Sequence, residues 1–200
     1  KIELPLDVQD AEVLLITPSA DFFAEPHIDG LLGYAKIFHQ SGTSWTLSSH
    51  ASEAANFAVF TGSYEQMRQI AERIRKAAED LNVKRIVVGE CGHAWRVAYN
   101  FWNTLVGPFD FLDNSYPIPQ HICEFTFDLI KDKKIKFDKS KNDHMTLTFH
   151  DSCNVSRASR MGEEPGGQYT YPREIIKACC NNFVDMAEDT IRENTYCCGG

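Results

Sequence analysis

The chain has 200 residues, of which 43% are hydrophobic and 24% are charged, and its formal net charge is −8. This composition is ordinary for a globular protein, and the acidic balance argues against nucleic acid as a partner, because phosphate contacts need a basic surface. The longest aliphatic runs are far shorter than the stretch that crosses a bilayer. Because the chain begins at Lys1 and closes on Cys-Cys-Gly-Gly, we interpret it as a fragment of a longer protein.

The first half of the chain alternates short apolar runs with helical patterns. Aliphatic and β-branched residues predict buried strands at 11–17, 44–48 and 84–90. Apolar residues at helical spacing predict helices over 28–42, 63–82 and 93–105, the second capped by Ser63. Strands that alternate with helices predict an α/β fold with parallel strands.

The second half follows after a stretch rich in glycine and proline. This stretch, residues 107–120, reads as a linker between a first lobe over 1–106 and a second lobe over 121–200. In the second lobe we expect helices over 122–134 and 172–180, and strands over 144–151 and 182–186.

The two halves share an order of elements that indicates an internal repeat. Aligning EVLLITPSAD with HMTLTFHDSCN places Ala20 opposite Cys153, and aligning FAVFTG with TYCCGG brings two more cysteines, Cys197 and Cys198, opposite apolar residues. The first copy has a cysteine only farther on, at Cys91, directly after the strand at 84–90. We therefore expect an α/β protein of two pseudo-symmetric lobes with parallel sheets, in which the first copy is degenerate.

The use of cysteine favours metal or redox chemistry in a reducing compartment. Seven cysteines in 200 residues are an odd number and too few for a disulfide scaffold. Three of them read as packing residues, because they lie at core positions of predicted helices: Cys123, Cys179 and Cys180.

The remaining cysteine motifs resemble a known family. HDSCNVSR followed by CCGG is similar to the cysteine-rich CCG domain of heterodisulfide reductases. With GECGHAW and PREIIKACCNNFVDM, the chain most resembles the heterodisulfide-reductase-like K subunit of the membrane redox complex linked to dissimilatory sulfite reductase. The family motif is completed by a Cys-x-x-Cys that this chain lacks.

This resemblance implies a noncubane [4Fe–4S] cluster, with Cys153, Cys197 and Cys198 as ligands. Thiolates are the soft ligands that such clusters select, and Gly199 lets the backbone turn close to them. Cys91 holds the position of the Cys-x-x-Cys in the degenerate copy, so it is a further ligand, a reactive thiol or a structural cysteine.

The implied function is that of an oxidoreductase subunit. The cluster would serve electron transfer to or from a disulfide-bearing protein or a small-molecule disulfide of sulfur metabolism. The implied partners are a membrane quinone-linked cytochrome subunit and other electron-transfer subunits, and through them a cytoplasmic protein would attach to the inner face of the membrane. The fragment alone is expected to be inactive and to bind little iron.

The sequence leaves open the roles of two histidines and allows two alternative functions. His93 and His150 flank the cysteine motifs and are either proton donors or hydrogen-bonded loop residues. The first alternative function is an electron relay in an oxidase of glycolate or lactate. The second is a structural zinc module, because the cysteines at positions 91, 153, 197 and 198 number four.

Overall fold

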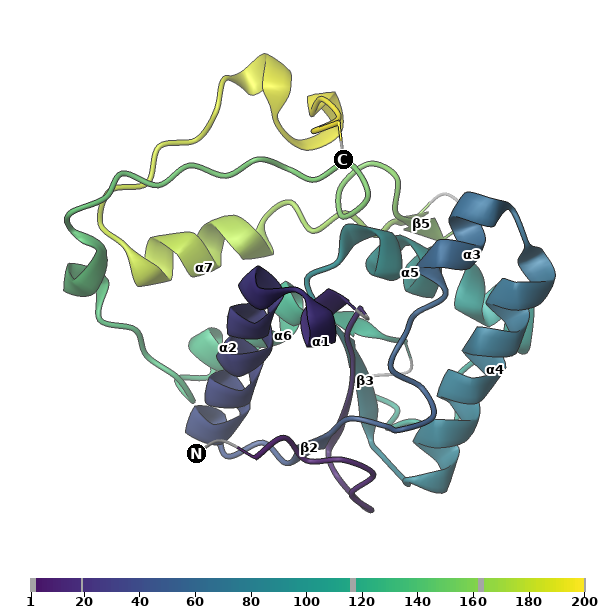
Figure 1. The fold of residues 1–200 in the computed structure, drawn as a ribbon. Helices are drawn as coiled ribbons and strands as arrows, with labels where there is room; N and C mark the ends of the chain where they lie inside the picture. The colour runs from purple at the N-terminus through teal and green to yellow at the C-terminus, as the bar shows by residue number, and fades with distance from the viewer. Residues whose placement is uncertain (1–2, 19, 116–117, 162–163, 200) are drawn as a thin grey trace.

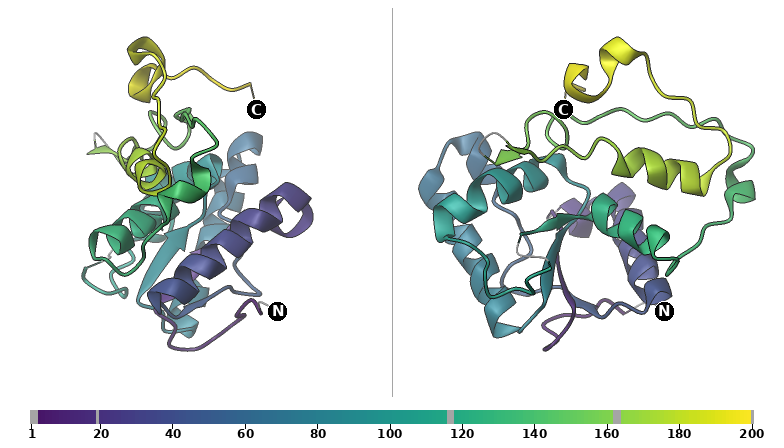
Figure 2. Two further views of the ribbon diagram at one scale, coloured as in Figure 1. Left: turned by 90° about the vertical axis from the view of Figure 1, so that its left-hand side faces the viewer. Right: turned by 180° about the vertical axis from the view of Figure 1, so that it is seen from behind.

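The centre of the molecule is a parallel sheet of four strands in the order β2-β1-β3-β4, with helices on both faces (Figures 1 and 2). This computed structural model describes residues 3–18, 20–115, 118–161 and 164–199. The strands of the sheet are β1 (Val13–Ile16), β2 (Trp45–Thr46), β3 (Arg85–Val88) and β4 (Gln120–His121). The helices are α1 (Ala20–Phe23), α2 (Glu25–Ser41), α3 (Asn56–Thr61), α4 (Tyr64–Asp80), α5 (Gly92–Val106), α6 (Ile122–Lys131) and α7 (Tyr171–Cys179).

The two central strands are buried along their whole length because both of their faces are covered. Val13 and Leu15 of β1 pack with α2 and α6, whereas Leu14 and Ile16 pack with α3, α4 and α5. This arrangement explains why the strands read as unbroken aliphatic runs and not as alternating ones. The predicted α/β fold with parallel strands is confirmed.

The long helices of the first half lie where their patterns predict them. Helix α4 begins after Ser63, whose hydroxyl accepts a hydrogen bond from the Gln66 backbone N–H at 3.2 Å. Helix α2 ends at Gly42, which adopts the left-handed conformation with φ of 69°. Glycine reaches this conformation without the steric cost that a side chain would bring.

The first sheet extends farther along the chain than the expected first lobe. Strand β4 pairs with β3, and Phe125 of the helix that follows packs in the same cluster as β1. Phe109 and Leu112, from the stretch read as a linker, are buried in the core on the other face. Residues 107–120 therefore also complete the first core, and the division into two lobes stays a prediction.

The second half contains less regular structure than its sequence predicts. The segments 144–151 and 182–186 form no extended strands; they meet in one isolated parallel bridge between Leu147 and Phe183. Two hydrogen bonds hold the bridge, from Leu147 N to Asn182 O at 2.8 Å and from Val184 N to Leu147 O at 2.9 Å. Its order, segment–α7–segment with parallel pairing, is that of β1–α2–β2.

Short 3-10 helices and a small antiparallel strand pair complete the described part of the second half. The 3-10 helices are Lys139–Asn142, Glu188–Thr190 and Arg192–Asn194, and β5 (Arg160–Met161) pairs with β6 (Glu164–Pro165). Among the described residues, no helix combines the length and the apolar character that a membrane-spanning segment needs.

Candidate functional site

The loop that carries Cys153 rests on the first turns of α5, the helix that follows Cys91. A Cβ atom placed on Gly92 would lie 3.0 Å from both Ser152 Oγ and Val155 Cγ2, so the two segments touch directly. Farther along α5, the Asn100 amide donates a hydrogen bond of 3.0 Å to the carbonyl of Ala158. Cys91 itself follows the carboxyl end of β3, the edge at which parallel α/β sheets bind their ligands.

The segment that precedes Cys197 and Cys198 is anchored to this same loop. Thr195 is fully buried, and its hydroxyl donates a hydrogen bond of 2.6 Å to the carbonyl of Asp151. The guanidinium of Arg157 donates to the carbonyls of Thr195 and Glu193. The final segment of the chain thus passes over α7 and returns to the loop of Cys153 (Figure 1). Hydrogen bonds thus join two cysteine motifs that lie 44 residues apart in the sequence.

Asp151 is the hub of these contacts. Its two carboxylate oxygens accept hydrogen bonds of 2.8 and 2.6 Å from Arg173 of α7, and one of them also accepts a bond of 2.7 Å from the Arg192 backbone N–H. Arg173 contacts Asp185 on its other side, at 2.6 Å. These bonds raise the pKa of Arg173 and lower that of Asp185. Because both Asp151 and Arg173 are buried, the pair fixes the loop on α7.

The thiols themselves differ in exposure. Cys153 is half-buried and receives a contact of 3.7 Å from the Asn154 amide, whereas Cys197 and Cys198 are exposed. The backbone N–H of Gly199 points to Cys197 Sγ at 3.4 Å, in a turn where Gly199 has φ of 86°. This left-handed turn needs glycine, and it presents both neighbouring thiols outward.

The positions of the thiols argue against a preformed zinc site. Among the described residues, no three of Cys91, Cys153, Cys197 and Cys198 bring their sulfur atoms within 4.8 Å of one another. Thiolates that share one zinc ion at about 2.3 Å would lie about 3.8 Å apart, so the arrangement does not fit a preformed zinc module. Thiolates that bind different iron atoms of a cluster lie farther apart. Soft thiolate donors on a glycine turn fit such a cluster.

Cys91 and the two candidate histidines have distinct surroundings. Burial raises the pKa of the Cys91 thiol, and the charges of Glu90 and Asp21 add to this effect. The ring of His93 packs edge-on against Phe60 at a centroid distance of 4.8 Å, and burial lowers its pKa. His150 is exposed. The roles of Cys91, His93 and His150 stay predictions.

The cysteines interpreted as packing residues lie in helices or directly after one. Cys180 is buried and Cys179 is half-buried at the end of α7. Burial raises the pKa of Cys123 to about 12, so that this thiol stays protonated at neutral pH. These environments are those of structural cysteines.

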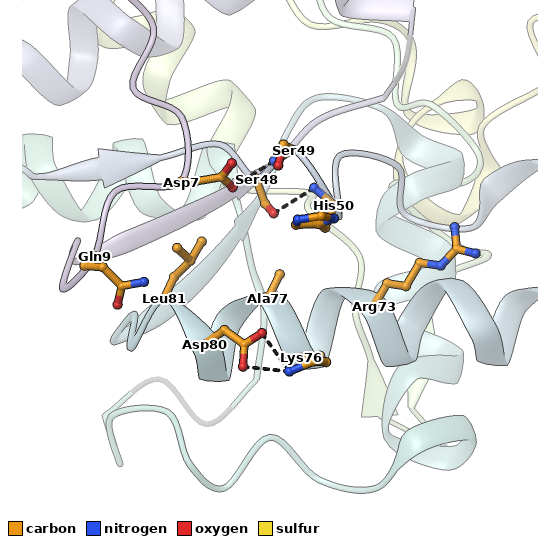
Figure 3. A pocket seen from close by; sticks show the side chains of 10 residues that line it. All are labelled: Asp7, Gln9, Ser48, Ser49, His50, Arg73, Lys76, Ala77, Asp80 and Leu81. Atoms are coloured by element: carbon orange, nitrogen blue, oxygen red, sulfur yellow. Dashed lines mark hydrogen bonds and ion pairs between the residues drawn. The ribbon is translucent and has the colours of Figure 1, made fainter.

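A large cavity lies away from the cysteine motifs. Its volume is about 650 Å³, and no cysteine is among the described residues that line it: Asp7, Gln9, Ser48, Ser49, His50, Arg73, Lys76, Ala77, Asp80 and Leu81 (Figure 3). It lies beside the last turn of α4, at the end of β3 opposite to Cys91. Two of its charged groups, Lys76 and Asp80, form an ion pair with each other at 2.7 Å.

Comparison with known proteins finds iron–sulfur subunits of redox complexes. The chain is 40% identical, over 94% of its length, to an "Hdr-like menaquinol oxidoreductase iron-sulfur subunit" of Archaeoglobus profundus, and 38% identical, over 97%, to the "iron-sulfur subunit 2" of Archaeoglobus fulgidus. The chain belongs to the heterodisulfide-reductase-like proteins. This chain spans only part of these two relatives, 38% and 39% of their lengths.

A more distant relative of this heterodisulfide-reductase-like chain is a component of the "dihydromethanophenazine:CoB–CoM heterodisulfide reductase" from Methanosarcina mazei. The two are 30% identical over 66% of this chain and 28% of the relative. No family model matches the chain, and no solved structure matches it.

Several residues that shape this site carry no signal in the sequence. Asp151 and Thr195 each lie two residues before a predicted ligand, and Arg173 lies in the first turn of α7. Charged and hydroxyl residues at such places are read as solvated surface. Only the parallel packing of two distant segments shows that they are buried and bonded.

Proposed function

We propose that the protein is an electron-transfer subunit that reduces or oxidises a disulfide-type substrate through a noncubane [4Fe–4S] cluster. The observation that carries the proposal is the anchoring of the Cys197–Cys198 turn to the Cys153 loop through Thr195. The names of the relatives support an iron–sulfur subunit of a redox complex.

Cys153, Cys197 and Cys198 are the residues that would hold the cluster. Two adjacent exposed thiols on a glycine turn can reach neighbouring iron atoms, and Cys153 approaches from the loop below. When bound, the cluster would supply single electrons, so that the two-electron cleavage of a disulfide proceeds in two steps.

The chain contributes the frame around these thiols. Arg157 is committed to the backbone carbonyls of the final segment, so we assign it to positioning that segment and not to binding an anionic substrate. Helix α5 closes the other side of the Cys153 loop and brings Cys91 and His93 to the same edge of the molecule. We propose that a proton for the departing thiolate enters from this edge.

The proposed partners follow from the relatives. Two of them are named menaquinol oxidoreductase subunits, so we propose that this protein works in a multisubunit complex on the cytoplasmic face of a membrane. A quinone-linked cytochrome subunit and other electron-transfer subunits would connect it to the quinone pool.

Electron paramagnetic resonance of the anaerobically purified full-length protein tests the ligands. We expect Cys197→Ser and Cys198→Ser to abolish the cluster signal, with iron and acid-labile sulfide falling from about four per chain. Cys179→Ala is the matched control and should keep the signal, because Cys179 lies at the end of α7. Loss of signal in the control together with its retention in Cys198→Ser contradicts the assignment.

A second measurement separates a disulfide enzyme from an electron relay. Adding a thiol substrate to the oxidised protein should change the cluster spectrum if a substrate sulfur binds there. An intact cluster whose spectrum stays the same with every thiol and disulfide tested would favour the relay.

A further inference from the structure

A second group of side chains of the types that bind metals lies at the carboxyl edge of the first sheet, next to Cys91 and separate from the proposed ligands Cys153, Cys197 and Cys198. Asp21 of α1, His27 in the first turn of α2 and Glu90, two residues after β3, bring one ligand atom each within 4.8 Å of one another. Side chains from three elements thus converge on one point.

The distances in this group are those between ligands of one metal ion. His27 Nδ1 lies 3.4 Å from Asp21 Oδ1 and 3.5 Å from Glu90 Oε1. Charge-assisted hydrogen bonds between such groups measure about 2.7–2.9 Å, so neither contact is a good one. Two ligands that bind one ion at about 2.1 Å are separated by about 3.0–3.4 Å, depending on the geometry. The spacing favours ligands around an ion over a bridging imidazolium.

Asp21 provides an independent reason to expect a cation. Its side chain is 1% exposed, and one carboxylate oxygen accepts a hydrogen bond from the Thr17 hydroxyl. The other oxygen, Oδ1, receives no hydrogen bond from any of the described residues, and it faces His27. A buried carboxylate oxygen that accepts no hydrogen bond is costly, and coordination to a metal removes that cost.

The surroundings of the group hold its members in place. The edge that carries Glu90 is braced by Tyr34, whose hydroxyl accepts a hydrogen bond of 2.9 Å from the Glu90 backbone N–H. Burial raises the pKa of Asp21, and burial together with the Asp21 charge raises that of Glu90. A cation between the two carboxylates would relieve both effects.

We propose that Asp21, His27 and Glu90 bind a divalent transition-metal ion. The imidazole nitrogen disfavours calcium and magnesium, which prefer oxygen ligands, and suits manganese, iron or zinc. Two carboxylates and a neutral imidazole balance the charge of the ion. Three protein ligands leave at least one position open to water. The site is distinct from the thiolates of Cys153, Cys197 and Cys198.

Manganese(II) is the probe, because it prefers oxygen and nitrogen ligands and binds thiolates poorly. The six-line spectrum of free Mn²⁺ should shrink on addition of the purified protein and indicate about one bound ion per chain. We expect His27→Gln and Asp21→Asn to weaken Mn²⁺ binding at least tenfold. His39→Gln on the same helix and Cys197→Ser at the thiolate site should leave the affinity unchanged.

Circular dichroism of each variant checks that the fold is kept, and His27→Gln changes a half-exposed side chain, so it gives the cleaner test. If the wild-type protein binds no Mn²⁺ at millimolar concentration, or if His27→Gln binds it as tightly as the wild type, the site does not exist. Because Cys197→Ser is included, failure of this site and failure of the cluster assignment give different results.

Discussion

Replacing Asp151 by asparagine should strongly destabilise the half of the protein that carries the cysteine motifs. The carboxylate accepts two hydrogen bonds from Arg173 and one from the Arg192 backbone N–H, at 2.6 to 2.8 Å. Asparagine has one acceptor oxygen, so the amide group that replaces the second oxygen would face N–H donors. At least one bond to a charged group is lost, and a buried guanidinium keeps only Asp185 as its carboxylate partner.

The size of the effect follows from burial. Asp151 is 1% exposed and Arg173 is 4% exposed, so water cannot replace the missing partner. Breaking a buried ion pair by removing one charge costs about 3–5 kcal/mol. Because Asp185 still contacts Arg173, we expect the lower end, a loss of about 3 kcal/mol in the free energy of unfolding.

Urea denaturation followed by circular dichroism and tryptophan fluorescence measures this loss. The matched control is Glu174→Gln, which removes the exposed ion pair with Lys177 on the same helix and should cost at most about 0.5 kcal/mol. If Asp151→Asn is as stable as the wild type, or if the control loses as much stability, the Asp151–Arg173 pair does not hold this half of the protein together.

Two further predictions concern the first half. Burial lowers the pKa of His121 to about 3, so the unfolded state binds more protons below pH 6.5, and this histidine should lower the unfolding free energy by about 2 kcal/mol at pH 5 relative to pH 8. His121→Leu should remove this contribution and His50→Gln should keep it; a His121→Leu variant with the same pH dependence as the wild type contradicts the assignment. Gly92→Ala should destabilise by about 1–3 kcal/mol, because its Cβ would lie 3.0 Å from the Cys153 loop. Gly33→Ala in α2, where an added Cβ would have nothing within 4 Å, should stabilise the protein by up to about 1 kcal/mol in thermal melts. If both glycine variants stabilise the protein, or if both destabilise it, the packing argument is wrong.

The sequence predicts the first sheet well because burial on both faces leaves unbroken aliphatic strands. Strand β4 cannot be predicted from the sequence, because a strand of two residues next to Pro119 is too short to show a hydrophobic periodicity. The segment 144–151 has strand-forming residues, but among the described residues it pairs only through the Leu147–Phe183 bridge. Strand propensity is realised only where the tertiary structure supports the strand.

For the candidate site, the cysteine motifs indicate the right loops, and the structure shows that these loops meet. The bonds that join them lie beyond sequence patterns, because Arg173 and Thr195 reach Asp151 across 22 and 44 residues. The Asp21–His27–Glu90 group is equally hidden, since its members come from three elements and only the parallel topology brings them together.

The docking of the Cys153 loop on α5 also sets an order of assembly. Its bonds are long-range: Arg96 reaches Asn154 across 58 residues, and Trp95 reaches Gly166 across 71. All four strands of the first sheet lie before residue 122, so this sheet can close while residues 144–199 are still unfolded. The Cys153 loop can dock only once the α5 surface that it contacts exists. We therefore expect the first half of the molecule to act as a template for the second, so that a cofactor delivered to the cysteines before the second half folds would meet a protein whose α5 surface is already in place.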